Sequence, residues 1–124
     1  MMDNVKNERT LALLGRTKQF ALRVMKMSDA LPRMNSAKNV GCQITRSATS
    51  AAANYRAAQR ARSKAEFVSK IRIVLEEIDE TKFWLEIIQE SNMLSEKQTE
   101  LLLNESSELT AIFCSISKSS AGSK

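Results

Sequence analysis

The sequence predicts an all-α protein that folds as an antiparallel, up-down-up-down four-helix bundle with a left-handed twist. The 124 residues include only one proline and three glycines, so the chain has few of the residues that form the turns between strands. Apolar residues recur in alternating steps of four and three, and this average of 3.5 residues is typical of left-handed helix packing. Short connections favour antiparallel neighbours. A chain of this length fits one domain, so we expect residues 1–124 to form a single bundle.

The first two helices are expected over about residues 10–30 and 36–62. Pro32 stops the first helix because it cannot continue the hydrogen-bond ladder, and Ser36 is a candidate N-cap for the second. The core stripe of the first is Leu13, Thr17, Phe20, Val24, Met27 and Leu31, and that of the second is Val40, Ile44, Ala48, Ala51, Tyr55 and Ala58. The small residues of the second stripe permit close helix approach.

The third and fourth helices are expected over about residues 63–91 and 95–116. Ser63 with Glu66 and Ser95 with Gln98 have the spacing of capping boxes. The third core stripe is Phe67, Ile71, Val74, Ile78, Thr81, Leu85 and Ile88, and the fourth is Leu102, Leu109, Ile112 and Ile116. The Ser/Gly/Lys tail over residues 117–124 is expected to be frayed.

Composition indicates a protein of the reduced cytoplasm. Cys42 and Cys114 lie far apart in the chain, no signal-like segment begins it, and we expect two unbridged, buried or half-buried thiols. No apolar run approaches the roughly 20 residues that span a bilayer, so no membrane partner is expected.

Charge gives the best indication of a partner. Residues 1–75 hold 15 Lys or Arg against 4 Asp or Glu, whereas residues 76–124 hold 4 against 10. In the second helix, Arg46, Arg56 and Arg60 project opposite the core side, with small residues between them, and Arg62 and Lys64 follow. Arginine forks match phosphate oxygens, so this face predicts RNA or DNA binding by charge. The alternative is that these arginines are solvated or pair with Glu76, Glu77, Asp79 and Glu80 of the same or a neighbouring subunit.

A second apolar side of the third helix predicts self-association. Ile73, Phe83, Trp84 and Ile87 fall well away from the core stripe at about 100° per residue. Several large apolar side chains on one side favour an oligomer interface. The alternative is that Trp84 and Ile73 cover the flank of the core.

Catalysis is not expected. The chain has no histidine, which removes Ser-His and Cys-His pairs and the Glu-x-x-His ligands of di-iron bundles. No glycine-rich phosphate loop is present, and adjacent acids such as Glu76 and Glu77 point in different directions on a helix. The sequence therefore predicts no catalytic residue, no metal site and no cofactor.

Motifs along nearly the whole chain resemble a known family. Gln43, Ile44, Arg46, Ser47, Ala48 and Ser50 precede Asn54-Tyr55-Arg56, followed by Arg60-Ala61-Arg62-Ser63-Lys64-Ala65, Phe67, Val74-Leu75-Glu76-Glu77 and Trp84-Leu85-Glu86. This order resembles the four helix bundle proteins first noticed in intervening sequences of bacterial 23S ribosomal RNA genes. Family members usually carry an acid after the Asn-Tyr-Arg motif, and Ala57 stands there in this chain.

The resemblance adds expectations about assembly and partners. The family is similar to ring-forming bundles that assemble as homopentamers, which supplies the number five. At the level of fold it is similar to the accessory subunit of diversity-generating retroelements, which binds a reverse transcriptase and its RNA template. Two hypotheses follow: a non-catalytic, oligomeric accessory protein that binds nucleic acid without strong sequence specificity, and a self-assembling scaffold or adaptor that binds a protein partner instead.

Overall fold

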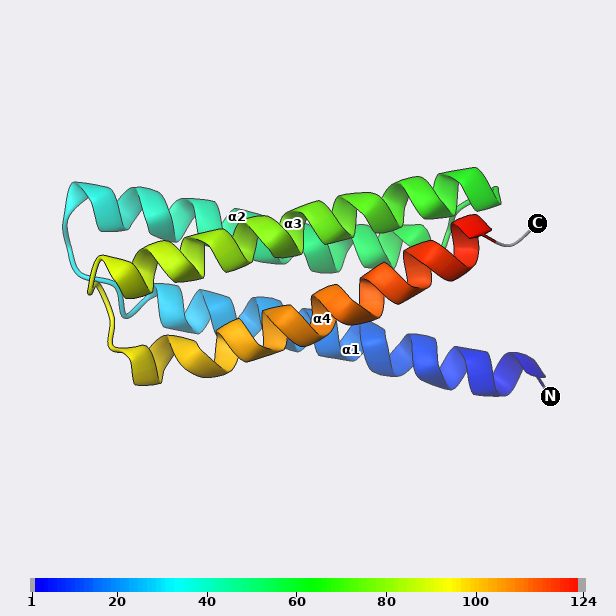
Figure 1. The fold of residues 1–124 in the computed structure, drawn as a ribbon, viewed down its shortest axis with the longest axis horizontal. Helices are drawn as coiled ribbons and strands as arrows, with labels where there is room; N and C mark the ends of the chain where they lie inside the picture. Colours follow the sequence, from blue (N-terminus) through cyan, green and yellow to red (C-terminus); the bar gives the residue numbers. More distant parts are fainter. Residues whose placement is uncertain (1, 123–124) are drawn as a thin grey trace.

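Four helices make up the described part of the protein. The computed structural model describes the backbone of residues 2–122 and the side chains of residues 8–121. The helices are α1 (Met2–Ser28), α2 (Asn35–Ala58), α3 (Lys64–Glu90) and α4 (Glu96–Gly122), and no strand occurs over residues 2–122. Consecutive helices run in opposite directions in Figure 1, and both ends of the chain lie at the same end of the bundle. The all-α, four-helix class is confirmed, and the left-handed twist stays a prediction.

The helices follow the chain order around the bundle. Within residues 2–122, the backbone of each helix lies close to that of the next one in sequence and that of α1 lies close to that of α4, whereas the backbones of the diagonal pairs α1 with α3 and α2 with α4 stay apart. The contact between α1 and α4 is the least extensive. Figure 1 shows these two helices diverging toward the end that carries both termini. The side formed by α2 and α3 is therefore opposite the looser side formed by α1 and α4.

The predicted stripes form most of the core. All six stripe residues of α2 are buried, as are those of α3 except Phe67, which is half-buried. The stripes of α1 and α4 are buried at their centres, whereas Leu13, Leu31, Ile112 and Ile116 are half-buried. The prediction missed Phe113, which is fully buried and packs edge-on against Tyr55 with ring centroids 5.0 Å apart.

A pair of hydroxyl groups lies inside the contact between α2 and α3. The side-chain oxygens of Ser47 and Thr81 are 2.7 Å apart, and both residues are fully buried. Ser47 Oγ also lies 3.1 Å from the carbonyl oxygen of Ile44, and Thr81 Oγ1 lies 2.8 Å from that of Glu77. Because each hydroxyl has one proton, one of the two donates to the other hydroxyl, which in turn donates to the carbonyl of its own helix. Among the described residues, every buried side-chain nitrogen or oxygen has a hydrogen-bond partner, which removes the cost of burying it.

Two of the three predicted N-caps form. The Glu66 amide donates to Ser63 Oγ over 3.0 Å, and the Gln98 amide donates to Ser95 Oγ over 3.3 Å while Gln98 Oε1 accepts from the Ser95 amide at 3.0 Å. The predicted cap at Ser36 is wrong. Met34 is the N-cap residue, with an extended backbone and no side-chain hydrogen bond to the helix, because α2 begins at Asn35, two residues earlier than a cap at Ser36 requires.

Helix α3 ends in a turn that closes over its last carbonyls. Asn92 has a φ of 62°, the left-handed conformation that follows many helices. Its amide donates to the Gln89 carbonyl at 3.2 Å, and the Met93 amide donates to the Ile88 carbonyl at 3.1 Å. This pair of bonds defines a Schellman motif, which reverses the chain toward α4.

Several helix limits differ from the predicted ones. Helix α1 begins at Met2 rather than near residue 10, because no proline or glycine interrupts the segment before it. Helix α2 ends at Ala58 rather than at residue 62, since Ser63 is extended in order to cap α3 and the chain must turn before it. Helix α4 continues to Gly122, so the predicted frayed tail is helical over residues 117–122, and residues 123–124 lie outside the described part.

Candidate nucleic-acid interface

The basic residues singled out in the sequence lie on the outward side of α2, in the turn after it and at the first residue of α3. The core side of α2 is fixed by its buried stripe, so residues on the opposite side of the helix project away from the bundle. All five predicted nucleic-acid residues are exposed: Arg46, Arg56, Arg60, Arg62 and Lys64. Ala53 and Ala57 are also exposed, which leaves the surface between the arginines smooth.

Arg46 differs from the other arginines because it pairs with acids of α3. Its guanidinium hydrogen-bonds Glu80, and its Nη1 lies 3.4 Å from Oε2 of Glu77. The hydrogen bond to Glu80 is the main reason that the pKa of Arg46 is raised, and the same bond lowers the pKa of Glu80. Glu77 also accepts from Ser50 Oγ at 2.9 Å. The ion-pair alternative therefore applies at this position, within one subunit.

Arg56, Arg60 and Arg62 have no acidic partner for their guanidinium groups among the described residues. Within residues 8–121, none of their guanidinium groups forms an ion pair or a hydrogen bond. They occupy the last turn of α2 and the connection to α3, so their charges gather near one end of the bundle. A helix C-terminus carries a partial negative charge, which favours cations there. These three side chains are free to contact a phosphate.

Aromatic rings offer little support for base stacking. Tyr55 is buried, and this burial raises the pKa of its hydroxyl. Trp84 is half-buried and donates its indole N–H to Glu80 Oε2 over 3.2 Å. Phe83 is 49% exposed but lies on α3 among acidic residues. The site therefore offers charge, not a stacking platform for splayed bases.

The predicted interface residues of α3 differ in exposure. Ile73, Trp84 and Ile87 are half-buried, and both Trp84 and Ile87 pack against the core. For Trp84 this position agrees with the alternative prediction that it covers the flank of the core. Phe83 extends outward and meets Trp84 edge-on, with ring centroids 5.0 Å apart. Phe83 is thus the residue of this set with the most surface to offer a partner.

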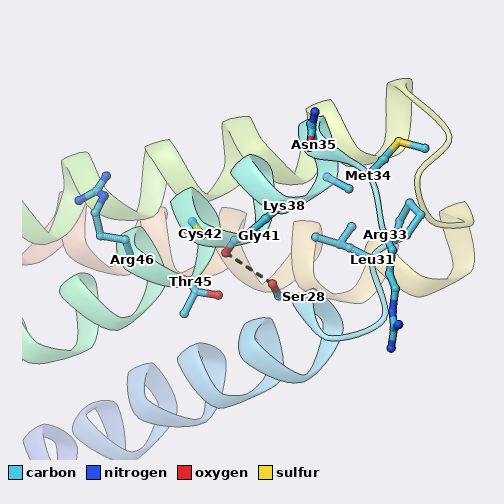
Figure 2. A pocket seen from close by; sticks show the side chains of 12 residues that line it. Ser28, Leu31, Arg33, Met34, Asn35, Lys38, Gly41, Cys42, Thr45 and Arg46 are labelled. Atoms are coloured by element: carbon cyan, nitrogen blue, oxygen red, sulfur yellow. Dashed lines mark hydrogen bonds between the residues drawn. The ribbon is translucent and has the colours of Figure 1, made fainter.

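A second basic region, of which the sequence prediction named only Arg46, surrounds a hollow at the α1–α2 connection. Figure 2 shows this pocket of about 780 Å³, where Ser28 Oγ donates to the Gly41 carbonyl at 3.4 Å. Its lining includes the apolar side chain of Leu31 and three cations, Arg33, Lys38 and Arg46. The sequence shows Arg33 and Lys38 only as part of the general excess of basic residues in the first 75 positions. It does not show that they line a pocket, because the pocket depends on the path of the connection between α1 and α2.

Other chemistry finds little support in the described part. Both cysteines are free, and Cys42 is exposed rather than buried, since it lies on the outward side of α2. Among residues 8–121, no cluster of three potential metal-ligating side chains occurs. None of the described helices combines the length and the apolar character that crossing a bilayer requires.

The fold and surface define a class: an all-α four-helix bundle with a basic outward helix. The sequence model of the 23S rRNA-intervening sequence proteins matches residues 9–121, and the chain belongs to that family. It is similar to a crystal structure of a protein of unknown function from the S23 ribosomal protein family of Bacteroides thetaiotaomicron. The two are 33% identical, with a TM-score of 0.79, and the match covers 85% of this chain and 97% of that one. No curated protein matches the chain.

Proposed function

We propose that this protein is a non-catalytic, homo-oligomeric accessory protein that binds nucleic acid through charge, without strong sequence specificity. The observation that carries the proposal is the group of exposed arginines at the end of α2 and just after it, namely Arg56, Arg60 and Arg62, whose guanidinium groups have no acidic partner among the described residues. A guanidinium that is not engaged within its own chain can form bidentate bonds to phosphate. Lys64, which is exposed beside them, adds a fourth positive charge.

Self-assembly would strengthen this binding. Several copies of the arginine group on one assembly can contact one strand at once, which raises the overall affinity without a new type of contact. Five copies is the number that the resemblance to ring-forming bundles implies. Phe83, exposed on α3 well beyond the connection that carries the arginines, supports an interface that leaves the arginine group uncovered.

The alternative function is a self-assembling scaffold that binds a protein partner. The ion pairs of Arg46 with Glu77 and Glu80 favour this alternative at Arg46, because a guanidinium that holds α2 against α3 is less available to bind a phosphate. A reverse transcriptase or another protein could be such a partner under either hypothesis. The two functions differ in whether Arg56, Arg60 and Arg62 matter for binding to RNA or DNA.

A matched pair of triple variants tests the proposal. The variant Arg56→Gln/Arg60→Gln/Arg62→Gln removes three charges from the proposed site, and Lys18→Gln/Arg23→Gln/Lys26→Gln removes three exposed charges of α1. Binding to mixed-sequence RNA and duplex DNA is measured by fluorescence anisotropy. We expect the first variant to bind at least ~10 times more weakly than the wild type and the control to change less than ~3 times, since phosphate contacts dominate such binding.

Two outcomes count against the proposal. Equal losses in the two variants would mean that net charge alone attracts the nucleic acid and that no site exists at the end of α2. An absence of binding to either ligand at low salt would favour the scaffold.

A further inference from the structure

The pocket at the α1–α2 connection combines an apolar interior with exposed cations (Figure 2). Among its lining residues, Ala37 is buried and Leu31 and Pro32 are half-buried, whereas Arg33 and Lys38 are exposed. Its volume of about 780 Å³ falls within the range of small-molecule sites, roughly 300 to 1,000 Å³. The pocket therefore offers apolar surface inside and positive charge toward solvent.

The charges of Arg33 and Lys38 are not matched within the described part of the chain. Neither side chain forms an ion pair or a hydrogen bond with residues 8–121, whereas Arg46, the third cation of the lining, is held by Glu77 and Glu80. The lining residues all fall within the described range 28–46, and none of them is Asp or Glu. An occupant of the pocket should therefore carry negative charge.

The start of α2 adds to this positive field. A helix N-terminus carries a partial positive charge, which a capping side chain or an acid in the first turn often offsets. Helix α2 has neither, because Met34 makes no side-chain cap and its first turn contains no acid. Met34, Asn35 and Ala37 also line the pocket, so an anion bound there lies close to the uncompensated end of the helix.

Nucleic acid matches this pocket poorly. No aromatic residue is among the lining residues, so a base finds no ring on which to stack. A phosphodiester backbone has no aliphatic group to bury against Leu31 and Pro32. The pocket also lies at the start of α2, at the end of the bundle opposite the chain termini, and the 24 residues of the helix separate it by about 36 Å from the arginines at the other end. A different kind of ligand is therefore indicated.

We propose that this pocket binds a small amphipathic anion, a soluble molecule with a phosphate monoester or carboxylate head on a short aliphatic chain. The head contacts Arg33 and Lys38 near the start of α2, and the chain covers Leu31, Pro32 and Ala37. This site is separate from the candidate nucleic-acid interface. It requires neither nucleic-acid binding nor self-assembly, so the failure of either leaves it unchanged.

Cys42 provides a reporter for occupancy, because it is a free, exposed thiol that lines the pocket. Its alkylation by iodoacetamide is followed by mass spectrometry, with Cys114, a free thiol of α4 outside the pocket, as the internal control. Hexyl phosphate and heptanoate should slow alkylation of Cys42 and leave that of Cys114 unchanged. Hexyl phosphate should act at a concentration at least ~10 times lower than inorganic phosphate, because burial of its chain adds to the charge contact. Hexyltrimethylammonium, which has the same chain and the opposite charge, should not protect Cys42.

Variants test the charges by calorimetric titration with hexyl phosphate. Arg33→Gln/Lys38→Gln should weaken binding at least ~10-fold, since it removes both charged contacts to the head. Arg23→Gln/Lys26→Gln removes two exposed charges of α1 outside the pocket and should change binding less than ~3-fold, since such charges are screened. Met34→Asp gives α2 a capping carboxylate, so it should raise the melting temperature and still weaken binding at least ~10-fold. Weaker binding by a more stable protein cannot result from unfolding.

Three results would overturn the inference. Hexyl phosphate and heptanoate could leave Cys42 as reactive as before, which would mean that the pocket binds neither head. Inorganic phosphate could protect as well as hexyl phosphate does, which would mean that the apolar interior contributes nothing. Mixed-sequence RNA could protect Cys42 where hexyl phosphate does not, which would make the pocket part of the nucleic-acid interface.

Discussion

At the scale of single residues, Arg16 joins the two helices that contact each other least. Its Nε and Nη2 donate to the two carboxylate oxygens of Glu105 at 2.7 and 2.8 Å, and Nη2 also donates to Glu108 at 2.7 Å. The Glu105 side chain is 15% exposed. A two-pronged bond of this geometry fixes orientation as well as distance, so Arg16 sets how closely α4 approaches α1.

This ion pair predicts a loss of stability in acid. The hydrogen bonds from Arg16 lower the pKa of Glu105 below its ordinary value of 4.5. A lowered pKa in the folded state means that the stabilisation is present above about 4.5 and is lost as the pH falls through the folded-state pKa. Urea unfolding between pH 7 and pH 3 should show Glu105→Gln less stable than the wild type by about 1 kcal/mol at pH 7, with the difference shrinking in acid. Glu100→Gln, an exposed acid on the same helix, is the control; a constant difference for Glu105→Gln would contradict the prediction.

The buried hydroxyl pair predicts a second residue-level effect. Thr81→Val keeps the shape of the side chain but removes the hydrogen bond to Ser47, so we expect a loss of about 1 kcal/mol in urea unfolding. Thr110→Val removes only a bond to the Ser106 carbonyl within its own helix and should cost less. Equal costs would mean that the bond between α2 and α3 contributes nothing of its own.

At the scale of elements, the turn after α3 depends on a left-handed residue. Asn92→Val should lower the free energy of unfolding by at least about 1 kcal/mol, because a β-branched residue is strained at a φ of 62°. Asn92→Gly should be neutral or stabilising, since glycine adopts this conformation without strain. Thermal melts of the two variants measure the difference, and a Val variant as stable as the Gly variant would refute the role of this turn.

Phe113 should contribute strongly to the packing of α4 against the rest of the bundle. Phe113→Ala leaves a cavity beside Tyr55 and should cost about 3–5 kcal/mol in chemical unfolding. Leu101→Ala, on an exposed position of the same helix, should change stability by less than about 0.5 kcal/mol. Similar losses in the two variants would mean that α4 is docked differently from this structure.

The elements also separate what the sequence could predict from what it could not. Periodicity was sufficient for α2 and α3, whose stripes are repeated without ambiguity and are buried almost completely. In α4, Ile112 and Phe113 both fit a helical stripe, and only the position of Tyr55 on α2 selects Phe113 for the core. Likewise, the sequence predicted ion pairs with the acids of residues 76–80 only as an alternative for all the arginines, and the packing of α2 against α3 limits these pairs to Arg46 with Glu77 and Glu80.

At the scale of the whole molecule, charge is divided along the sequence. The excess of cations in residues 1–75 lies on α1, α2 and the start of α3, and the excess of acids in residues 76–124 lies on the rest of α3 and on α4. Packing partly cancels the two, as Arg16 and Arg46 show. The cations that remain uncompensated at the end of α2 are the ones that the proposed function uses. The sequence indicated the basic helix, and the structure was needed to distinguish Arg46 from Arg56, Arg60 and Arg62.

The most direct measurement is the affinity of the purified protein for mixed-sequence RNA across a salt series. If Arg56, Arg60 and Arg62 bind phosphates, affinity should fall steeply as salt rises. Glutamine at all three positions should then reduce the slope of log affinity against log salt by about 2 for a single strand, which is about 0.7 for each arginine replaced. An affinity that does not respond to salt, or no binding at the lowest salt, would contradict the account.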